Sequence, residues 1–236
     1  MPRLAEAAPA ARPSGADPDP PAALTVGRRD TAAVRAMIEE VSVELLVRNG
    51  YQGFRFKDVA DALHTTRAAI HYHYGNKQTL ADTVVVKYIT QLLSDWERNW
   101  DRKAPFAVKI IGMMEANKSR YLTFNPTLTD SNPWSLIGRM RGDRDHIGPA
   151  AREALVGFGI TLERFIIKAI DDAVANGEFE PTVPRRDVAL QLVAIADSAG
   201  AITLDGGSFE RLEMLYRSFA RILEHAYGLK EQPAAR

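Results

Sequence analysis

Residues 50–80 read GYQGFRFKDVADALHTTRAAIHYHYGNKQTL, and they contain two short helical patterns separated by a tight turn. The apolar spacing predicts helices over residues 56–63 and about 66–72, and a third helix begins at Lys77. The second helix carries a dense row of polar, basic and aromatic side chains between Arg67 and His73. No other part of the chain concentrates so many chemically distinctive residues, so this segment is the first candidate for a functional surface.

Two helices that cross at a tight turn need a small residue where they approach and apolar residues in the angle between them. Ala60 is the small residue, and Val59, Leu63 and Ile70 are spaced to face one core. The turn itself often needs a positive φ, which favours glycine, and that position holds His64. We therefore expect a helix-turn-helix with a conformational cost of about 1 kcal/mol at His64.

The second helix of such a unit enters the major groove of DNA by its N-terminal end. Arg67 stands at that end, where a guanidinium suits the O6 and N7 atoms of guanine. Thr65 and Thr66 suit helix capping and phosphate contact, and Lys77 with the amides of its own helix start suits a second phosphate. The candidate DNA contacts are Thr65, Thr66, Arg67, Ala68, Ala69, His71, Tyr72, His73 and Lys77. Ile70 and Tyr74 should point back to the core.

This segment, from about residue 31 to residue 80, resembles the N-terminal domain of the TetR/AcrR family of transcriptional regulators. The resemblance rests on Gly50-Tyr51, Lys57-Asp58-Val59-Ala60, Ala62, Thr66, Ile70, His73-Tyr74, Lys77 and Leu80. The chain departs from the family pattern at His64 and Ala68, where glycine is common, and at His71, where tyrosine is usual. Phe54 and Arg55 stand where a threonine and a serine usually cap the helix and touch phosphate. These departures should alter individual DNA contacts and leave the fold intact.

The rest of the chain shows apolar residues at helical spacing, and no alternating segment is longer than a few residues. Gly50 should end the first helix, Asn176-Gly177 should end a long one, and Ser208 is the expected N-cap of the last. Further helices are predicted at 77–100, 106–124, a short stretch near 134–140, 151–176, 188–204 and 209–227. The predicted fold class is therefore all-α, with about nine helices.

Residues 1–27 hold six prolines and eight alanines, a composition that disfavours a long helix and predicts a disordered tail. The tail is either an extension without a role or an arm whose terminal Arg28 and Arg29 reach a phosphate. The expected organisation is a tail at 1–27, a helix-turn-helix domain at 28–80, a ligand-binding and dimerisation domain at 81–228, and a second disordered tail at 229–236.

The overall charge of the chain is zero, so any affinity for DNA must come from a local surface. Residues 28–80 contain eight basic and six acidic side chains, which makes the segment only mildly basic. The absence of cysteine excludes disulfides and thiolate chemistry. The sequence has no continuous apolar run of about 18 residues and no secretory signal pattern, so we expect a cytoplasmic protein without a membrane span.

Metal-binding and enzymatic interpretations are weaker. His64, His71 and His73 do not share one helical face, and no carboxylate pattern supports a metal site. Asp171-Asp172 and the segment 143–146 are more simply read as a solvated helix face and a polar loop than as acid–base pairs. We therefore expect no metal, no cofactor and no catalytic site.

The last two predicted helices offer a surface for a second copy of the chain. Residues 188–204 contain many small side chains, which allow close helix packing, and residues 209–227 carry an apolar stripe. The family resemblance implies that this pair forms a four-helix interface in a homodimer. The alternative is that the pair only closes the core of the monomer.

The resemblance also implies an effector cavity between the middle helices, whose apolar and aromatic walls suit an apolar or aromatic molecule. Its candidate contacts are Trp96, Trp100, Met113, Asn117, Tyr121, Trp134, Phe158 and Phe165. Asn125 and Arg139 are further polar candidates. Residues 125–149 form either a gate for this cavity or a simple loop.

The function implied is a homodimeric repressor that leaves a palindromic operator when an effector binds and pivots the helix at 77–100. One alternative is a DNA-binding regulator without a small-molecule ligand, controlled by a protein partner or acting as an activator. Another is an enzyme or scaffold that uses the helix-turn-helix only for packing.

Overall fold

The computed structural model describes residues 31–229, and within this range the chain is an assembly of helices joined by short turns. Their bounds are α1 Thr31–Gly53, α2 Phe56–Ala62, α3 Arg67–Tyr74, α4 Lys77–Asp101, α5 Phe106–Phe124, α6 Leu136–Gly142, α7 Pro149–Ala175, α8 Arg185–Gly206 and α9 Glu210–Tyr227. The prediction of an all-α fold of about nine helices is confirmed for these residues. The predicted tail at residues 1–27 and nearly all of the tail at 229–236 lie outside them.

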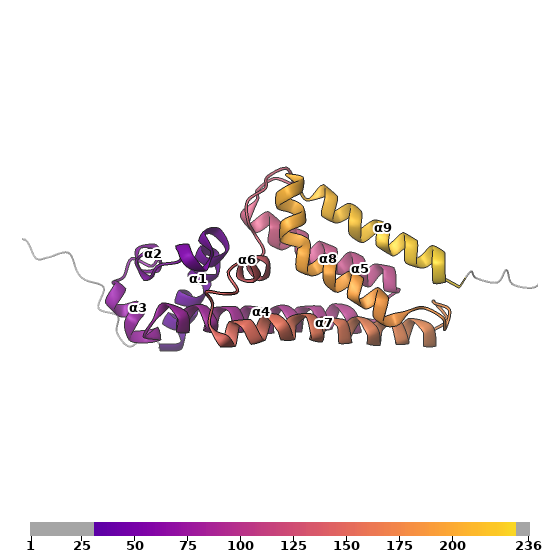
Figure 1. Cartoon of the computed structure of the whole chain (residues 1–236), viewed down its shortest axis with the longest axis horizontal. Helices are drawn as coiled ribbons and strands as arrows, with labels where there is room; N and C mark the ends of the chain where they lie inside the picture. Colours follow the sequence, from indigo (N-terminus) through magenta and orange to yellow (C-terminus); the bar gives the residue numbers. More distant parts are fainter. Residues whose placement is uncertain (1–30, 230–236) are drawn as a thin grey trace, which may run out of the picture.

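The helices form two connected parts (Figure 1). Helices α1 to α3 gather at one end, and α5, α8 and α9 lie at the other, with α6 between them. Helices α4 and α7 run the length of the molecule side by side and in the same direction. The amide of Gly148, just before α7, donates to Asp82 near the start of α4, and Lys168 pairs with Asp101 at its end. Helix α4 thus belongs to both parts and connects them.

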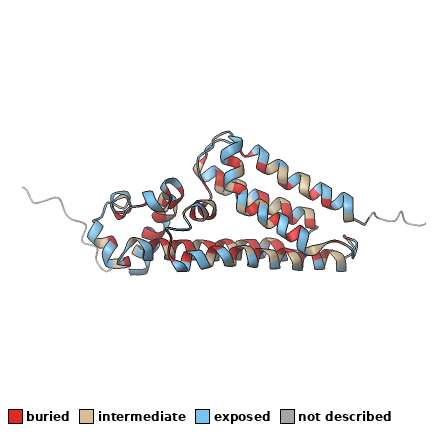
Figure 2. Cartoon of the chain, in the orientation of Figure 1, coloured by how far each residue is buried: buried red, intermediate tan, exposed pale blue. Residues whose placement is uncertain are grey.

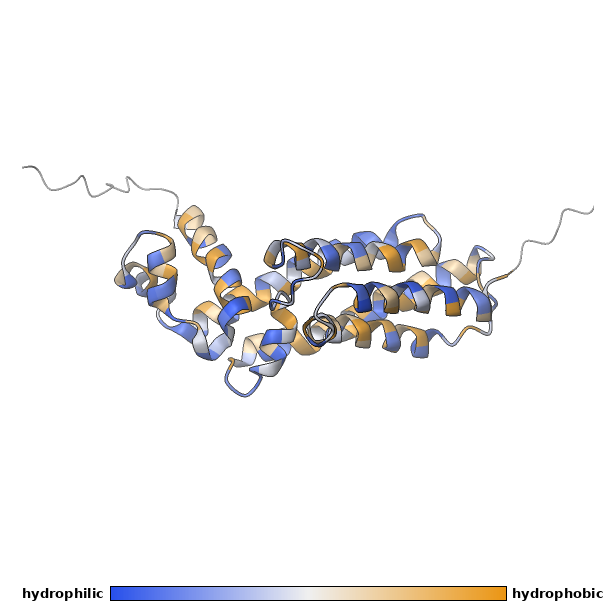
Figure 3. Ribbon diagram, turned by 90° about the horizontal axis from the view of Figure 1, so that it is seen from above, coloured by the Kyte–Doolittle hydropathy of each residue, from blue (hydrophilic) through white to orange (hydrophobic). Residues whose placement is uncertain are grey.

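The core follows the apolar spacing of the sequence. Buried positions lie along the facing sides of α4 and α7 (Figure 2), and hydropathy alternates around each helix in the same way (Figure 3). Aromatic pairs fill the space between the middle helices, with Trp96 against Phe158 at 5.5 Å and Tyr121 against Phe209 at 5.2 Å between ring centroids. These contacts stabilise the packing beyond the area that they bury.

Glycines end helices where the sequence indicated. Helix α1 leaves helical geometry at Gly50, where φ is +68° and ψ is 177°, before a last short turn to Gly53. Asn176 caps α7 and Gly177 follows at φ +73°. The expectation for α9 was wrong in one detail. Its N-cap is Phe209, which is fully buried, and no amide of the described helix donates to the Ser208 hydroxyl.

Among the described helices, α8 alone is long and apolar enough by composition to qualify as a membrane span. Core helices of soluble proteins meet the same criterion, so the observation is weak. Helix α8 packs against α6, α7 and α9, and Leu192, Ala196 and Ala199 are buried in those contacts. Packing inside this helical domain accounts for the buried part of its apolar surface.

Candidate nucleic-acid interface

The turn between α2 and α3 has the geometry that a helix-turn-helix requires. His64 adopts a φ of +50°, the one positive value among the described non-glycine residues. The amide of Thr65 then donates to the carbonyl of Ala60 at 2.9 Å, which closes the turn. Val59 and Ala60 are buried where the helices meet, as the spacing predicted.

Buried residues fix the orientation of α3. Ile70 is fully buried, and the Tyr74 ring is buried with its hydroxyl donating to Glu39 of α1 at 2.6 Å. Lys87 of α4 donates to the other oxygen of Glu39 at 2.5 Å. Burial raises the pKa of Glu39, but the hydrogen bonds from Lys87 and Tyr74 and the charges of Lys87 and Arg35 outweigh it, so the pKa lies below its ordinary value. One carboxylate thus ties α3 to both α1 and α4.

The N-terminal end of α3 faces solvent. Thr65, Thr66, Arg67 and Ala68 are exposed and Ala69 is half-buried. Thr66 caps the helix by accepting a hydrogen bond from the amide of Ala69 at 3.2 Å. The guanidinium of Arg67 makes no hydrogen bond or ion pair with any described residue, so all its donors are free for a ligand. Tyr72 is also open, with 86% of its surface exposed.

Three other candidates for DNA contact are held by the protein itself. The His71 ring packs edge-on against Phe56 and hydrogen-bonds the carbonyl of Gly75 at 2.8 Å. His73 is half-buried beside Tyr72. The ammonium of Lys77 donates to the carbonyl of Gln52 at 3.2 Å and lies over the Tyr51 ring. Their roles at DNA remain predictions, and in this structure His71 and Lys77 stabilise the turn around α3.

The structure adds a groove that sequence reasoning did not identify. It has a volume of about 440 Å³ and lies between the start of α2 and the recognition helix α3. Its walls include Arg55 and Lys57 beside Arg67 and Lys77, so four cationic side chains converge there. Arg55 is oriented by two hydrogen bonds to Asp58, at 3.0 and 3.1 Å. The sequence feature that could have indicated this groove is the basic pair Arg55 and Lys57, at the N-cap and the second residue of α2. Backbone amides at the start of a helix also favour phosphate.

This arrangement of α1 to α3 is matched by a known sequence family. Residues 38–84 fit the sequence model for bacterial regulatory proteins of the TetR family. The chain carries a TetR-family DNA-binding domain. No curated protein matches the chain in sequence.

Solved structures resemble the chain well beyond this TetR domain. A TetR transcriptional regulator from Chloroflexus aurantiacus superposes with a TM-score of 0.71 at 19% identity, covering 86% of this chain and all of that one. NemR of Escherichia coli in its reduced form gives 0.69 at 11% identity, with the same coverage. A TetR regulator from Legionella pneumophila gives 0.62 at 20% identity, covering 79% of this chain and 95% of that one. Identities this low establish a shared TetR fold and nothing finer.

The candidate effector residues of the body lie in its packed core. Seven are buried and Phe165 is half-buried. Their polar atoms are partly satisfied, since Asn117 donates to the hydroxyl of Tyr216 at 3.0 Å and Tyr121 donates to the carbonyl of Asp130. The indole N–H groups of Trp96 and Trp100 are buried without a hydrogen-bond partner among the described residues. Of the eight candidates, Trp134 lines one of the larger described pockets, which lies beside α6 rather than between the middle helices.

A second set of contacts joins the TetR DNA-binding domain to the body. The amide of Tyr51, just after Gly50, donates to the carboxylate of Asp143 at 2.7 Å. Arg139 of α6 donates to the carbonyl of Arg48 in α1 at 3.4 Å. A side chain on Gly50 would come within 2.8 Å of Asp143, so the backbone of α1 fits closely against α6. Helix α6 is therefore in contact with the DNA-binding domain, a joint that no local sequence pattern indicated.

Proposed function

We propose that the chain is a homodimeric transcriptional regulator that binds a palindromic operator through α3 and is released by a small effector. The DNA-binding domain is of the TetR type, and a regulator of this kind acts by binding rather than by catalysis. The observation that carries the proposal is the free guanidinium of Arg67 at the exposed end of a helix whose opposite face is fixed by Ile70 and Tyr74. The role places the protein in the cytoplasm, where its operator is.

Dimerisation is supported by apolar side chains left open on the last two helices. Leu190 and Leu204 of α8 are 46% and 50% exposed, and Met214 and Ile222 of α9 are 56% and 65% exposed. Helices α8 and α9 pack against each other, so these residues lie on adjacent elements. Exposed apolar surface of this kind is typical of a protein–protein contact. A dimer would also set two α3 helices at a fixed spacing for two half-sites.

Effector release is supported by the unpartnered indole groups of Trp96 and Trp100, which an acceptor on a bound molecule would satisfy. The dense packing of the middle helices favours a second candidate function. In that case the protein is a DNA-binding regulator that takes no small molecule between these helices and responds to a protein partner, or acts as an activator.

Selection of bound sequences from a pool of random duplexes tests the proposal. A dimer reading DNA through two α3 helices should select a palindrome whose half-sites are about one helical turn apart, or a multiple of it. Selection of an asymmetric single site would overturn the dimeric part. Failure to enrich any sequence would overturn operator recognition itself.

A further inference from the structure

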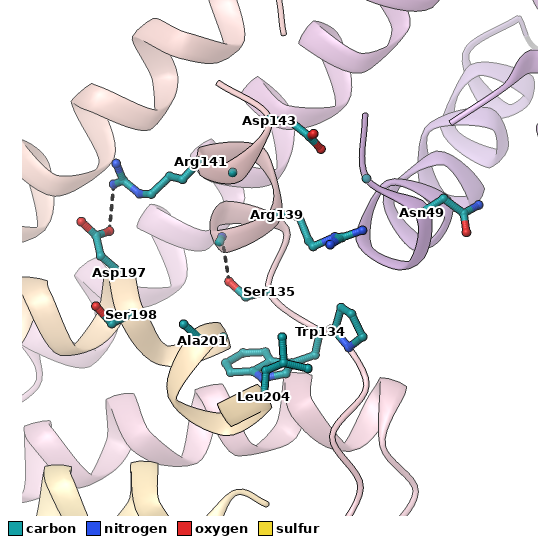
Figure 4. A pocket seen from close by; sticks show the side chains of 15 residues that line it. Asn49, Trp134, Ser135, Arg139, Arg141, Asp143, Asp197, Ser198, Ala201 and Leu204 are labelled. Carbon is teal, nitrogen blue, oxygen red and sulfur yellow. Dashed lines mark hydrogen bonds and ion pairs between the residues drawn. The ribbon is translucent and has the colours of Figure 1, made fainter. Parts of the chain in front are cut away.

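A pocket of about 490 Å³ lies where the DNA-binding domain meets the body (Figure 4). Its walls come from the end of α1, from α6 with the segment before it, and from the last turns of α8. The volume is within the range of about 300–1,000 Å³ that small-molecule sites occupy. The pocket does not overlap the core between the middle helices, apart from the shared side chain of Trp134.

One end of the pocket is apolar. Trp134, Ala201 and Leu204 lie together at that end (Figure 4), and Pro133, which precedes Trp134 in the chain, also lines the pocket. The indole N–H of Trp134 is already satisfied, because it donates to the hydroxyl of Thr203 at 2.7 Å. This end therefore offers a ring face and aliphatic carbons, which suit the body of an organic molecule.

The other end presents arginines. Arg141 turns toward α8 and pairs with Asp197 at 2.8 Å, whereas Arg139 points toward α1 (Figure 4). Arg139 has no ion pair within the described residues, and its side chain makes one hydrogen bond there, the 3.4 Å contact with the carbonyl of Arg48. The Nε atoms of both arginines are buried without a hydrogen-bond partner. A buried donor left unpaired costs about 1–3 kcal/mol, so a native structure rarely keeps one without a reason.

The acidic groups around the pocket are already engaged. Asp197 is neutralised by Arg141, and Asp143 accepts from the amide of Tyr51 and faces the ammonium of Lys77. The C-terminal end of α6 favours basic side chains, which accounts for the presence of arginines there. It does not satisfy their Nε donors. Asp143 also lies near Arg139, since a side chain on Gly50 would come within 2.8 Å of its carboxylate and 3.1 Å of the Arg139 guanidinium. Among the described residues of this pocket, Arg139 is nevertheless the arginine that forms no ion pair with a carboxylate.

We propose that this pocket is a binding site for a small organic carboxylate, with its anionic group on Arg139 and its apolar body against Trp134 and Leu204. A guanidinium binds a carboxylate through two parallel hydrogen bonds, and the terminal nitrogens of Arg139 make a single hydrogen bond with the described residues, the 3.4 Å contact with Arg48.

The position of the site predicts how binding would act on DNA recognition, and this part rests on the proposed function. A carboxylate bound to Arg139 would compete with the carbonyl of Arg48 for the guanidinium. The bound molecule would also lie beside Gly50, which lines the pocket. Both contacts belong to the joint that holds α1 against α6. A ligand that binds better when this joint is loosened shifts the population toward that state and changes the orientation of α3.

Titration calorimetry of the full chain tests the site without DNA. The probes are 2-naphthoate and octanoate, a flat and a linear carboxylate, each compared with its primary amide as a neutral isostere. At least one carboxylate should bind with one site per chain and about tenfold or more tighter than its amide. R139Q should remove that preference and R139K should retain part of it. The control R144Q, an exposed arginine just beyond α6, should leave it unchanged.

The site is overturned if neither carboxylate binds, if the amides bind equally well, or if R144Q lowers affinity as much as R139Q. Since the amide comparison uses the unmodified protein, it tests for a carboxylate site even if R139Q fails to fold, and R139K then tests whether that site includes Arg139. Duplex affinity is then measured with and without the carboxylate that binds. If carboxylate binding depends on Arg139 but does not change the affinity for DNA, only the proposed coupling is overturned. If the chain binds no duplex at all, the proposed function is overturned and the calorimetric result still stands.

Discussion

Arg67 is the side chain on which base recognition is expected to depend. It is exposed at the first turn of α3 and makes no side-chain hydrogen bond or ion pair with residues 31–229. Replacement by alanine should reduce affinity for the selected operator by about 1–3 kcal/mol and relax base preference at one position in each half-site. Competition binding against a set of operator variants measures both effects. R98A, which removes an exposed arginine from α4 in the body, serves as the control, and unchanged selectivity in R67A would show that another residue reads the base.

Glu39 is the residue that orients α3 from beneath. The E39Q substitution keeps the shape of the side chain and removes the charge that Tyr74 and Lys87 contact. A hydrogen bond to a charged group is worth about 1.5–3 kcal/mol. The free energy of unfolding at neutral pH should therefore fall by roughly 1.5–3 kcal/mol when the charge is removed. Urea denaturation of both proteins measures the difference.

The carboxylate of Glu39 should also make the stability of the protein depend on pH. The folded pKa of Glu39 lies below its ordinary value of 4.5, so its stabilising effect is complete above that pH and is lost as the pH falls through the folded pKa. The stability gap between the native chain and E39Q should therefore narrow below about pH 4.5. A gap that stays constant between pH 7 and pH 3.5 would contradict the assignment of a paired carboxylate.

Local patterns in the sequence could predict the exposed and buried sides of α3, because Ile70, Tyr74 and Arg67 differ in polarity at helical spacing. They could not predict that Tyr74 meets Glu39, 35 residues earlier in the chain, or that Lys87 completes the contact. Such contacts depend on which helices pack together. The periodic pattern within one helix shows which face is buried but does not show which helix covers that face.

At the scale of elements, the turn between α2 and α3 contains a residue in a conformation that suits glycine better. His64 is exposed, so its side chain contributes little packing, while its φ of +50° is unfavourable for any residue with a Cβ atom. H64G should be more stable than H64A by about 1 kcal/mol, since glycine has no Cβ to strain. Thermal denaturation of the two variants measures this difference, and equal stabilities would show that the turn tolerates the positive φ without strain.

Helices α8 and α9 are the elements assigned to self-association. I222E places a charge on a side chain that is 65% exposed in the single chain, so the monomer should fold normally and the dimer should be lost. Light scattering after size exclusion should report the mass of one chain instead of two. V108E, on an exposed position of α5, is the matched control and should remain dimeric. A dimeric I222E protein would place the interface elsewhere.

Helix bounds follow closely from the sequence, because apolar spacing, glycines and prolines act within each element. The predicted bounds for α4, α5 and α9 agree with the structure to within one residue at each end. The predicted effector cavity stays a prediction. A row of aromatic residues indicates apolar walls but does not distinguish a cavity from rings that pack against each other, as Trp96 and Phe158 do here.

At the scale of the whole molecule, the joint between α1 and α6 connects DNA recognition to the body. D143A removes the acceptor of the Tyr51 amide, and the loss of one charge-assisted hydrogen bond should raise amide exchange in α1 about tenfold. Exchange in α8 and α9 should not change. Hydrogen exchange with mass spectrometry measures both regions, and D145A, which alters an exposed neighbour, is the control. Equal exchange in D143A and the native chain would show that α6 does not restrain α1.

If two copies of this chain bind one palindromic duplex through α3, titration of the selected duplex with the full chain should show it. Fluorescence anisotropy at several salt concentrations is the measurement. We expect two chains per duplex, affinity that falls steeply as salt rises, and much weaker binding of a duplex with one half-site scrambled. Binding that is indifferent to salt, or equal affinity for the intact and the scrambled duplex, would show that the chain does not read a palindrome as a dimer.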